Sequence, residues 1–298
     1  MEKITLKGGC FVLAAVYGEG NTDGGSPLSQ VIGTTTGSLH LSQFRLSVKE
    51  GQSPQNSGAG QSPIYSFGQS DVLLFVIDGH PQVTISGKTF EAAPEAGLYV
   101  RPGEAFQITP SPQSSPTRGE EAHNIPSPLM GEGQNVDNGQ NPKALSLDGR
   151  GLGEGDSLRM LVTVCPEAEV QQLDAMPTNF DETFPDRLVA PDASLREEMG
   201  ERYYQVLVGK KQGSEQVTQF IGKIPKSKAP SHHHLYEEAL YVLSGEGFMW
   251  TGDMSAPVSP GSIIFLPKKQ EHSLECTSDA GLRVAGHFYP AGSPAENY

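Results

Sequence analysis

The chain repeats itself, and this internal duplication restricts its fold more than any other feature of the sequence. Short apolar segments of the first half recur in the same order in the second. The pairs are FVLAAVYG (11–18) with YYQVLVGK (203–210), LSQFRLSVKEGQSP (41–54) with VTQFIGKIPKSKAP (217–230), LLFVIDG (73–79) with ALYVLSG (239–245), GLYVRP (97–102) with GSIIFLP (261–267), and LRMLVTVCP (158–166) with LRVAGHFYP (282–290). They are rich in β-branched and aromatic residues and bounded by glycine or proline, which is typical of β-strands. We predict two similar all-β domains, closed into barrels that leave few strand edges exposed.

The duplication also predicts where the domains begin and end. With 298 residues the chain is long enough for two domains. We expect an N-terminal barrel, a linker and a C-terminal barrel over 1–166, 167–200 and 201–298. In the linker we expect one helix from about Asp192 to Glu201, capped by Asp192. The stretch at about 109–156 is dense in Gly, Pro, Ser and Asn, and is expected to be a disordered surface insertion without chemistry.

Charge and cysteine content narrow the classes of partner and compartment. The formal net charge of −14 excludes a nucleic-acid partner and disfavours an anionic membrane surface. Cys10, Cys165 and Cys276 lie far apart without metal-type spacing, which favours a reducing compartment, the cytoplasm. The apolar run from Cys10 to Val16 is too short to span a membrane or to act as a signal peptide. We expect a small-molecule partner, with a homodimer as one option for assembly.

Histidines cluster in the second half. His232 and His234 are two residues apart, a spacing that places both imidazoles on one face of a strand. Glu238 follows at the start of the next apolar segment, and His272 follows Pro267 at the start of another. Three imidazoles and one carboxylate suit a borderline divalent metal ion. The alternative is that the adjacent histidines form a solvated loop without a metal.

These residues resemble the two motifs of the cupin superfamily. The first motif is matched by His232, His234, Glu238 and Gly245, and the second by Gly261, Pro267 and His272. The sequence departs from the pattern at Lys269, where the family usually has glycine, and at Cys276, where it often has asparagine. The resemblance implies a double cupin (bicupin), with two double-stranded β-helix, jelly-roll barrels. It also implies one divalent transition metal in the second barrel: iron or manganese first, with zinc, nickel or cobalt as alternatives.

The first barrel offers no such ligands at the matching places. The segment over 55–72 contains no histidine, and Val72 aligns with Glu238. Either Phe106 or Gln107 falls near the position of His272. Because a metal needs N, O or S donors in a fixed shell, we expect the first barrel to hold none.

Several side chains around the predicted site are candidates for further roles. We expect Tyr236, Trp250 and His287 to contact substrate, although packing roles are the alternative for each. Glu238 is the candidate catalytic residue, as a metal ligand able to accept a proton. By strand alternation, His233 and Glu237 point away from the metal. Four lysines flank the ligand segments and either steer an anionic substrate or belong to solvated loops: Lys226, Lys228, Lys268 and Lys269.

The resemblance implies a fold and a metal but no single reaction. Our first hypothesis is a metal-dependent bicupin enzyme that acts on a small organic substrate. An anionic substrate is one option within this hypothesis. Dioxygenase chemistry ranks ahead of isomerase or hydrolase chemistry. The ureidoglycine aminohydrolases also keep their metal in the second of two cupins, but with a differently spaced ligand set, so they rank lower. The second hypothesis is a non-catalytic cupin that binds or senses a small molecule.

Overall fold

The computed structural model describes residues 2–15, 27–49, 60–111, 157–296 and 298. The described residues form strands joined by loops, with single 3-10 turns as their only helical structure. The predicted insertion begins inside strand β10 (Ala105–Pro110), and from residue 112 it lies outside the described residues. No helix in the described part of the chain is long and apolar enough to cross a membrane.

The first barrel consists of two antiparallel sheets around one core. In spatial order, the larger sheet contains β13 (Leu188–Val189), β9 (Gly97–Val100), β6 (Asp71–Asp78), β11 (Ser157–Cys165), β4 (Ser42–Lys49) and β3 (Leu28–Ile32). The smaller sheet contains β12 (Gln171–Leu173), β5 (Ile64–Ser66), β10, β7 (Pro81–Ile85) and β8 (Lys88–Glu91). Phe44, Leu74 and Phe106 are among the buried side chains that fill the space between the sheets.

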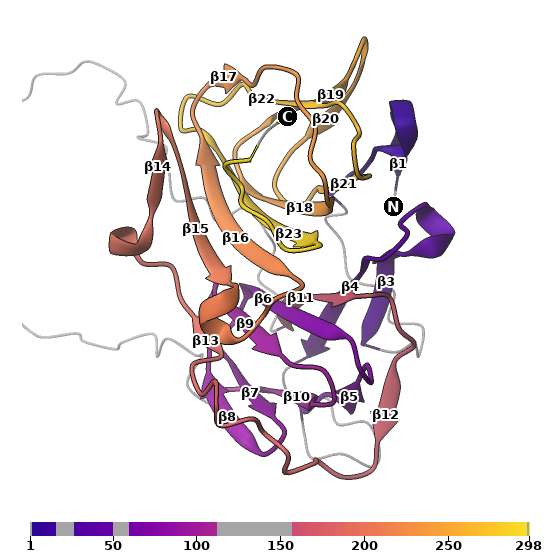
Figure 1. Ribbon diagram of the computed structural model, residues 1–298, viewed down its shortest axis with the longest axis vertical. Coiled ribbons are helices and arrows are strands. Elements are labelled where there is room, and N and C mark those ends of the chain that lie inside the picture. Colours follow the sequence, from indigo (N-terminus) through magenta and orange to yellow (C-terminus); the bar gives the residue numbers. More distant parts are fainter. Residues whose placement is uncertain (1, 16–26, 50–59, 112–156, 297) are drawn as a thin grey trace, which may run out of the picture.

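The second barrel repeats this plan. Its larger sheet contains β1 (Lys3–Thr5), β2 (Phe11–Leu13), β21 (Ile263–Leu266), β18 (Glu237–Ser244), β23 (Leu282–Tyr289), β16 (Thr218–Ile224), β15 (Arg202–Val208) and β14 (Glu197–Met199). Its smaller sheet contains β17 (Ser227–Lys228), β22 (Ser273–Cys276), β19 (Gly247–Thr251) and β20 (Met254–Val258). The two barrels lie one above the other in Figure 1, with β1 beside the upper, C-terminal barrel.

The registers of the two larger sheets confirm the predicted duplication. Strand β6 lies between β9 and β11, as β18 lies between β21 and β23. Val72 pairs with Val164 in the first sheet, and Glu238 pairs with Phe288 in the second. Val72 therefore occupies the position of Glu238, as the sequence alignment predicted. The chain has the all-β, double-barrel fold expected from its repeats.

The N-terminal strand does not open the first barrel. Phe11 of β2 pairs with Phe265 of β21, so the first strands of the chain extend the sheet of the second barrel. The true counterpart of β15, which pairs with β16, is β3, which pairs with β4. The predicted equivalence of 11–18 with 203–210 is therefore wrong. The local pattern indicates a strand but does not identify its neighbour, since pairing partners are chosen by long-range packing.

The predicted linker over 167–200 is built into both barrels. It supplies β12 and β13 to the first and β14 to the second. Arg187 anchors it, with its fully buried guanidinium donating to both carboxylate oxygens of Glu104 at 2.7 and 3.0 Å. A bidentate pair of this kind fixes the segment in one position. Strands from the predicted linker thus pair with strands of both barrels. The exact domain boundaries stay a prediction.

The helix expected from Asp192 to Glu201 is wrong in extent. Only a 3-10 turn forms, over Ala193–Leu195, and the side chain of Asp192 accepts a hydrogen bond from the Ser194 N–H at 2.8 Å. The capping role of Asp192 is therefore confirmed. The helix ends there because the next residues, β14, pair with β15 as a strand.

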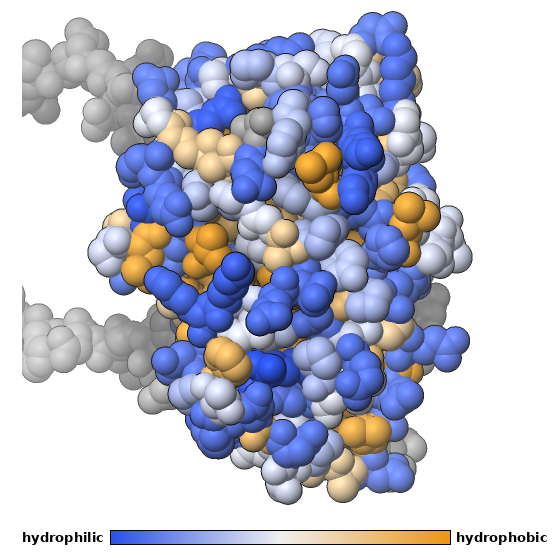
Figure 2. All heavy atoms as spheres, viewed as in Figure 1, coloured by the Kyte–Doolittle hydropathy of each residue, from blue (hydrophilic) through white to orange (hydrophobic). Residues whose placement is uncertain are grey.

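The larger sheets of the two barrels pack face to face. A hydrophobic cluster between them combines side chains such as Phe75 and Leu161 with Phe265 and Ile221. The buried carboxylate of Glu237 adds a polar connection, accepting hydrogen bonds from residues 38–41 of the first barrel. The view in Figure 2 shows a largely hydrophilic outer face with scattered apolar residues, as expected when the large apolar surfaces lie between the sheets.

Candidate metal centre

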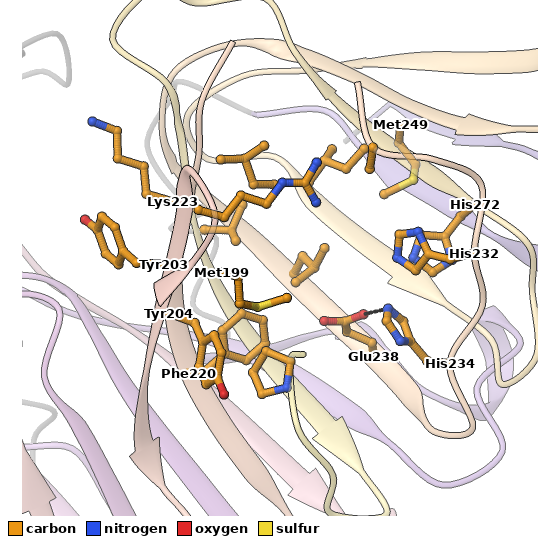
Figure 3. A pocket seen from close by; sticks show the side chains of 18 residues that line it. Met199, Tyr203, Tyr204, Phe220, Lys223, His232, His234, Glu238, Met249 and His272 are labelled. Atoms are coloured by element: carbon orange, nitrogen blue, oxygen red, sulfur yellow. Dashed lines mark ion pairs between the residues drawn. The ribbon is translucent and has the colours of Figure 1, made fainter. Parts of the chain in front are cut away.

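Two backbone segments bring the predicted histidines together. His232 and His272 form an isolated antiparallel bridge, with N–H···O distances of 3.0 and 2.9 Å between their backbones. His234 follows just before β18, and Glu238 is the second residue of that strand. The ligand atoms of the three histidines all lie within 4.8 Å of one another. Figure 3 shows these imidazoles and Glu238 on one side of a pocket.

The ring tautomers follow from the hydrogen bonds of the three imidazoles. In each ring Nδ1 lies beside a backbone carbonyl, which can only accept a proton. The carbonyls belong to Pro230 for His232 (2.9 Å), Glu296 for His234 (3.0 Å) and Gln270 for His272 (2.9 Å). Nδ1 must therefore carry the hydrogen in all three rings, and Nε2 presents a free lone pair.

Burial keeps these rings in the form that binds metal. Desolvation lowers the pKa of His272 to about 3 and that of His234 to about 4. It also lowers the pKa of His232, with a smaller contribution from the positive charge of Arg202. All three imidazoles are thus neutral at pH 7, and no proton has to leave before Nε2 can coordinate a metal.

Glu238 completes the donor set. Its side chain is buried, and one carboxylate oxygen lies 3.6 Å from Nε2 of His234. It accepts no hydrogen bond from any described residue, and desolvation raises its pKa to about 8. At pH 7 and without a metal this carboxyl therefore keeps its proton, and a cation that binds its oxygen and the three imidazole lone pairs would displace that proton. These four residues therefore fit one divalent transition metal.

Lys269, one of the departures from the cupin motif, adopts a backbone conformation that favours glycine. Lys269 has a φ of +65°, in the left-handed region that favours glycine. Its N–H donates to the carbonyl of His234 at 2.8 Å, which ties the two ligand segments together. The lysine adopts the glycine conformation at a cost of about 1–2 kcal/mol.

Tyr236 and Trp250 lie near the site, but neither lines the pocket. The Tyr236 ring is buried and stacks on His234, with ring centroids 4.7 Å apart. Trp250 donates to Glu275 at 2.7 Å, and the Lys228 ammonium lies 3.6 Å from the centroid of its ring. Tyr236 therefore holds a ligand ring in place, and Trp250 belongs to the outer sheet surface.

His287 faces the other way from the metal ligands. It is fully buried between the barrels, with Nδ1 3.0 Å from Nε2 of Gln43 and 3.3 Å from Oγ1 of Thr163. Alternation along β23 explains the position, because its neighbour Phe288 fills the second barrel and His287 must point to the opposite face. The expectation that it contacts substrate is not met by this placement.

The corresponding positions of the first barrel hold aromatic side chains. Phe106 pairs with Tyr65 across β10 and β5, as His272 pairs with His232. Two residues after Tyr65, Phe67 takes the place of His234, with its ring 6.5 Å from that of Phe106. We refer to Tyr65, Phe67 and Phe106 as the aromatic trio, and to His232, His234 and His272 as the histidine trio. Of the two residues considered for the His272 position, the register selects Phe106.

The pocket beside the histidine trio has a volume of about 110 Å³ and includes residues that the sequence did not indicate. Its apolar lining includes Phe220, Leu240 and Leu274, and its cations are Arg202 of β15 and Lys223 of β16. None of the four lysines considered from the sequence lines it; Lys226, for example, pairs with Asp279 at 2.8 Å. Arg202 and Lys223 lie far from either motif, and only sheet pairing brings them to the site.

Comparison with known proteins identifies the fold of both halves. The cupin domain family matches residues 223–286, which contain the histidine trio and Glu238. No curated protein matches the sequence. Among solved structures, the chain is similar to protein Ylba from E. coli, with 13% identity, a TM-score of 0.58, and coverage of 98% of this chain and 96% of that one.

Two further structures show how widely this fold is used. A salicylate 1,2-dioxygenase from Pseudaminobacter salicylatoxidans shares 7% identity with a TM-score of 0.56, covering 88% of this chain and 76% of its own. Procruciferin, an 11S globulin from Brassica napus, shares 11% identity with a TM-score of 0.56, covering 85% and 77%. At such identities the likeness concerns the fold. With a match to the cupin domain in its second half and structural neighbours over nearly its whole length, this chain contains a cupin domain and has the double-barrel, bicupin fold.

Proposed function

We propose that the protein is a metal-dependent bicupin enzyme that acts on a small organic molecule in its second barrel. The observation that carries the proposal is the convergence of three imidazole Nε2 lone pairs and a buried carboxylate on the wall of an open pocket. A closed structural site would have no use for a cavity beside its ligands. The donor set suits iron or manganese first, with zinc, nickel or cobalt as alternatives.

Oxygenase chemistry is the leading reaction class within this proposal. A bound metal of this kind would supply Lewis acidity and, if redox-active, the capacity to react with dioxygen. The similarity in fold to a salicylate 1,2-dioxygenase supports the same class, at the level of the fold. We assign Glu238 a second role as proton acceptor, because it is the only carboxylate among the pocket residues. Leu240, Met249 and Leu274 would keep water from the reacting groups.

The test combines metal analysis with turnover. The full chain, purified without a His-tag, would be loaded with Fe(II), Mn(II), Ni(II), Co(II) or Zn(II). Each form would be assayed for oxygen uptake and product mass with catechols, β-diketones, flavonols and hydroxy acids. We expect turnover with one metal and its loss in Glu238→Ala. Turnover that persists in Glu238→Ala and His272→Ala would place the chemistry elsewhere.

A non-catalytic binding or sensing role is the second candidate. The observation that favours it is the similarity in fold to procruciferin, an 11S globulin, which shows that this fold also occurs outside the dioxygenases. Saturable ligand binding without turnover under every metal would support this alternative.

The cytoplasmic location also belongs to the proposal. Cys10, Cys165 and Cys276 are all buried and free, as a reducing compartment would leave them. The protein would be denatured without a reductant and treated with a thiol label. A mass increase equal to three labels, measured on the intact protein, would support this location.

A further inference from the structure

One arginine in the pocket has no partner for its charge among the residues that the structure describes. Arg202 is the first residue of β15, where it pairs through its backbone with Met199 of β14, and its half-buried side chain lines the pocket. Among the arginines that the structure describes, Arg202 alone has no side-chain hydrogen bond, ion pair or ring contact. The partners of the others are Gly261 for Arg45, Asp181 for Arg101, Asp78 for Arg159, Glu104 for Arg187, Tyr203 for Arg196 and Glu95 for Arg283.

The charge of the pocket is opposite to that of the protein. The chain has a formal net charge of −14, yet the charged residues lining this cavity are Arg202, Lys223 and Glu238. The single carboxylate is assigned to the metal, so the two cations have no anion to balance them. Figure 3 shows the ammonium of Lys223 directed away from the imidazoles, so the positive charge near the ligands would come from Arg202 and a bound divalent metal. Such a site would attract and hold an anion.

Arg202 and the metal ligands belong to one small space. Arg202 lines the same pocket as His232 and His272. The cavity volume of about 110 Å³ is somewhat below the ~150 Å³ that accommodates a benzene ring. A ligand that enters far enough to reach the metal therefore also comes near Arg202.

We infer that Arg202 is a specificity-determining residue that binds a carboxylate group of the substrate. The planar guanidinium offers two parallel N–H donors that match the two oxygens of a carboxylate. A carboxylate also suits a small, mainly apolar pocket better than a phosphate, which carries more charge and needs more donors. The inference rests on the proposed function in that it assigns Arg202 and the metal to the same ligand.

The test compares carboxylates with their neutral amides. Glycolate, lactate and 2-hydroxybenzoate would each be paired with glycolamide, lactamide and 2-hydroxybenzamide. Binding to the Co(II)-loaded full chain would be measured by calorimetry and by the visible spectrum of the metal. We expect at least one acid to bind about 10- to 100-fold more tightly than its amide, the range of a charge-assisted hydrogen-bonded pair. Arg202→Gln should remove that preference without changing metal content, and Arg202→Lys should restore part of it.

The matched control is Arg196→Gln, which removes the same charge from a residue that contacts Tyr203 but does not line the pocket. This variant should keep the preference for acids. Equal loss of acid and amide binding in Arg202→Gln, or no binding of any acid to the wild type, would overturn the inference. Binding of inorganic phosphate but of no carboxylate would also overturn it. Binding of acids that depends on Arg202 but leads to no turnover would support the inference and reject the enzyme proposal. Turnover of a neutral substrate that Arg202→Gln does not affect would support the enzyme proposal and reject the inference.

Discussion

The two barrels place different side chains at the same positions of the same strand arrangement. The aromatic trio of the first barrel packs ring against ring, and its members are 0–2% exposed. The histidine trio of the second turns three Nε2 atoms toward one another beside a pocket. Val72 and Glu238, at matching positions of β6 and β18, differ in the same way. One set of interior positions can thus supply either packing or ligands.

This difference shows what a metal site would cost the barrel that holds it. Aromatic rings fill volume and need no further partner for most of their surface. Imidazoles and a carboxylate at the same depth each need a polar partner, and the second barrel recruits three backbone carbonyls for the histidines. We therefore expect the aromatic trio to contribute to the stability of the first barrel. We expect the stability of the second barrel to depend on metal binding.

The largest expected effect is on metal content. His232→Ala and His272→Ala each remove one ligand, and should weaken metal binding by more than the about 10- to 100-fold typical of losing an outer-shell partner. Elemental analysis of desalted, metal-loaded protein should find one metal per wild-type chain and almost none in either variant. The control is His233→Ala, which should keep its metal. The ring of His233 is not among the ligands and lies 6.0 Å from the ring of Tyr298. Two metals per chain would mean that the first barrel also binds a metal, which would contradict the difference between the two barrels described above.

The matching change in the first barrel should affect stability. Phe106→Ala leaves a cavity in the aromatic trio and should lower the free energy of unfolding by about 3–5 kcal/mol, with metal content unchanged. Denaturant unfolding followed by elemental analysis would measure both. If Phe106→Ala proved harmless to stability, the trio would not be the packing centre of the first barrel.

A smaller effect should come from the contact between the barrels. The carboxylate of Glu237 accepts hydrogen bonds from three backbone N–H groups and the Ser38 hydroxyl, at 2.7–3.2 Å. Glu237→Gln turns an amide N–H₂ toward some of these donors and should cost about 1.5–3 kcal/mol of unfolding free energy. Glu238→Gln, on the opposite face of the same strand, should instead abolish metal binding. Identical behaviour of the two variants would contradict the assigned faces.

The most gradual effect, about 1.4 kcal/mol for each unit of pH, concerns how stability depends on pH. Burial lowers the pKa of His287 to about 3, well below the ordinary value of 6.5. Between these values the unfolded chain binds a proton that the folded chain does not, so stability is lost as the pH falls from about 6.5 toward 3. Each such group contributes about 1.4 kcal/mol per pH unit within that window. His287→Gln should make the slope of unfolding free energy against pH shallower by up to this amount, measured on metal-free protein. An unchanged slope would show that His287 is not the buried neutral ring described.

The all-β fold, the duplication and the candidate ligand set could all be predicted from the sequence. The ligand motif is local, since His232 and His234 are two residues apart and strand alternation selects Glu238 over Glu237. The predictions that His233 and Glu237 point away from the candidate ligands agree with the structure, because successive side chains of a strand point to opposite faces. The missing ligands of the first barrel were equally visible, since Val72 and Phe106 align with Glu238 and His272.

Other features depend on contacts between distant parts of the chain, and only the tertiary structure decided them. The amino acids of β2 favour a strand, but its partner β21 lies about 250 residues away, and no local pattern encodes that choice. His287 is on the strand that the repeat predicted, yet its role follows from the first barrel packing against that face. Arg202 reaches the pocket only because β15 joins β16 and β16 joins β23. Local residue chemistry therefore determined which groups could bind a metal, whereas sheet pairing and barrel packing determined what surrounds it.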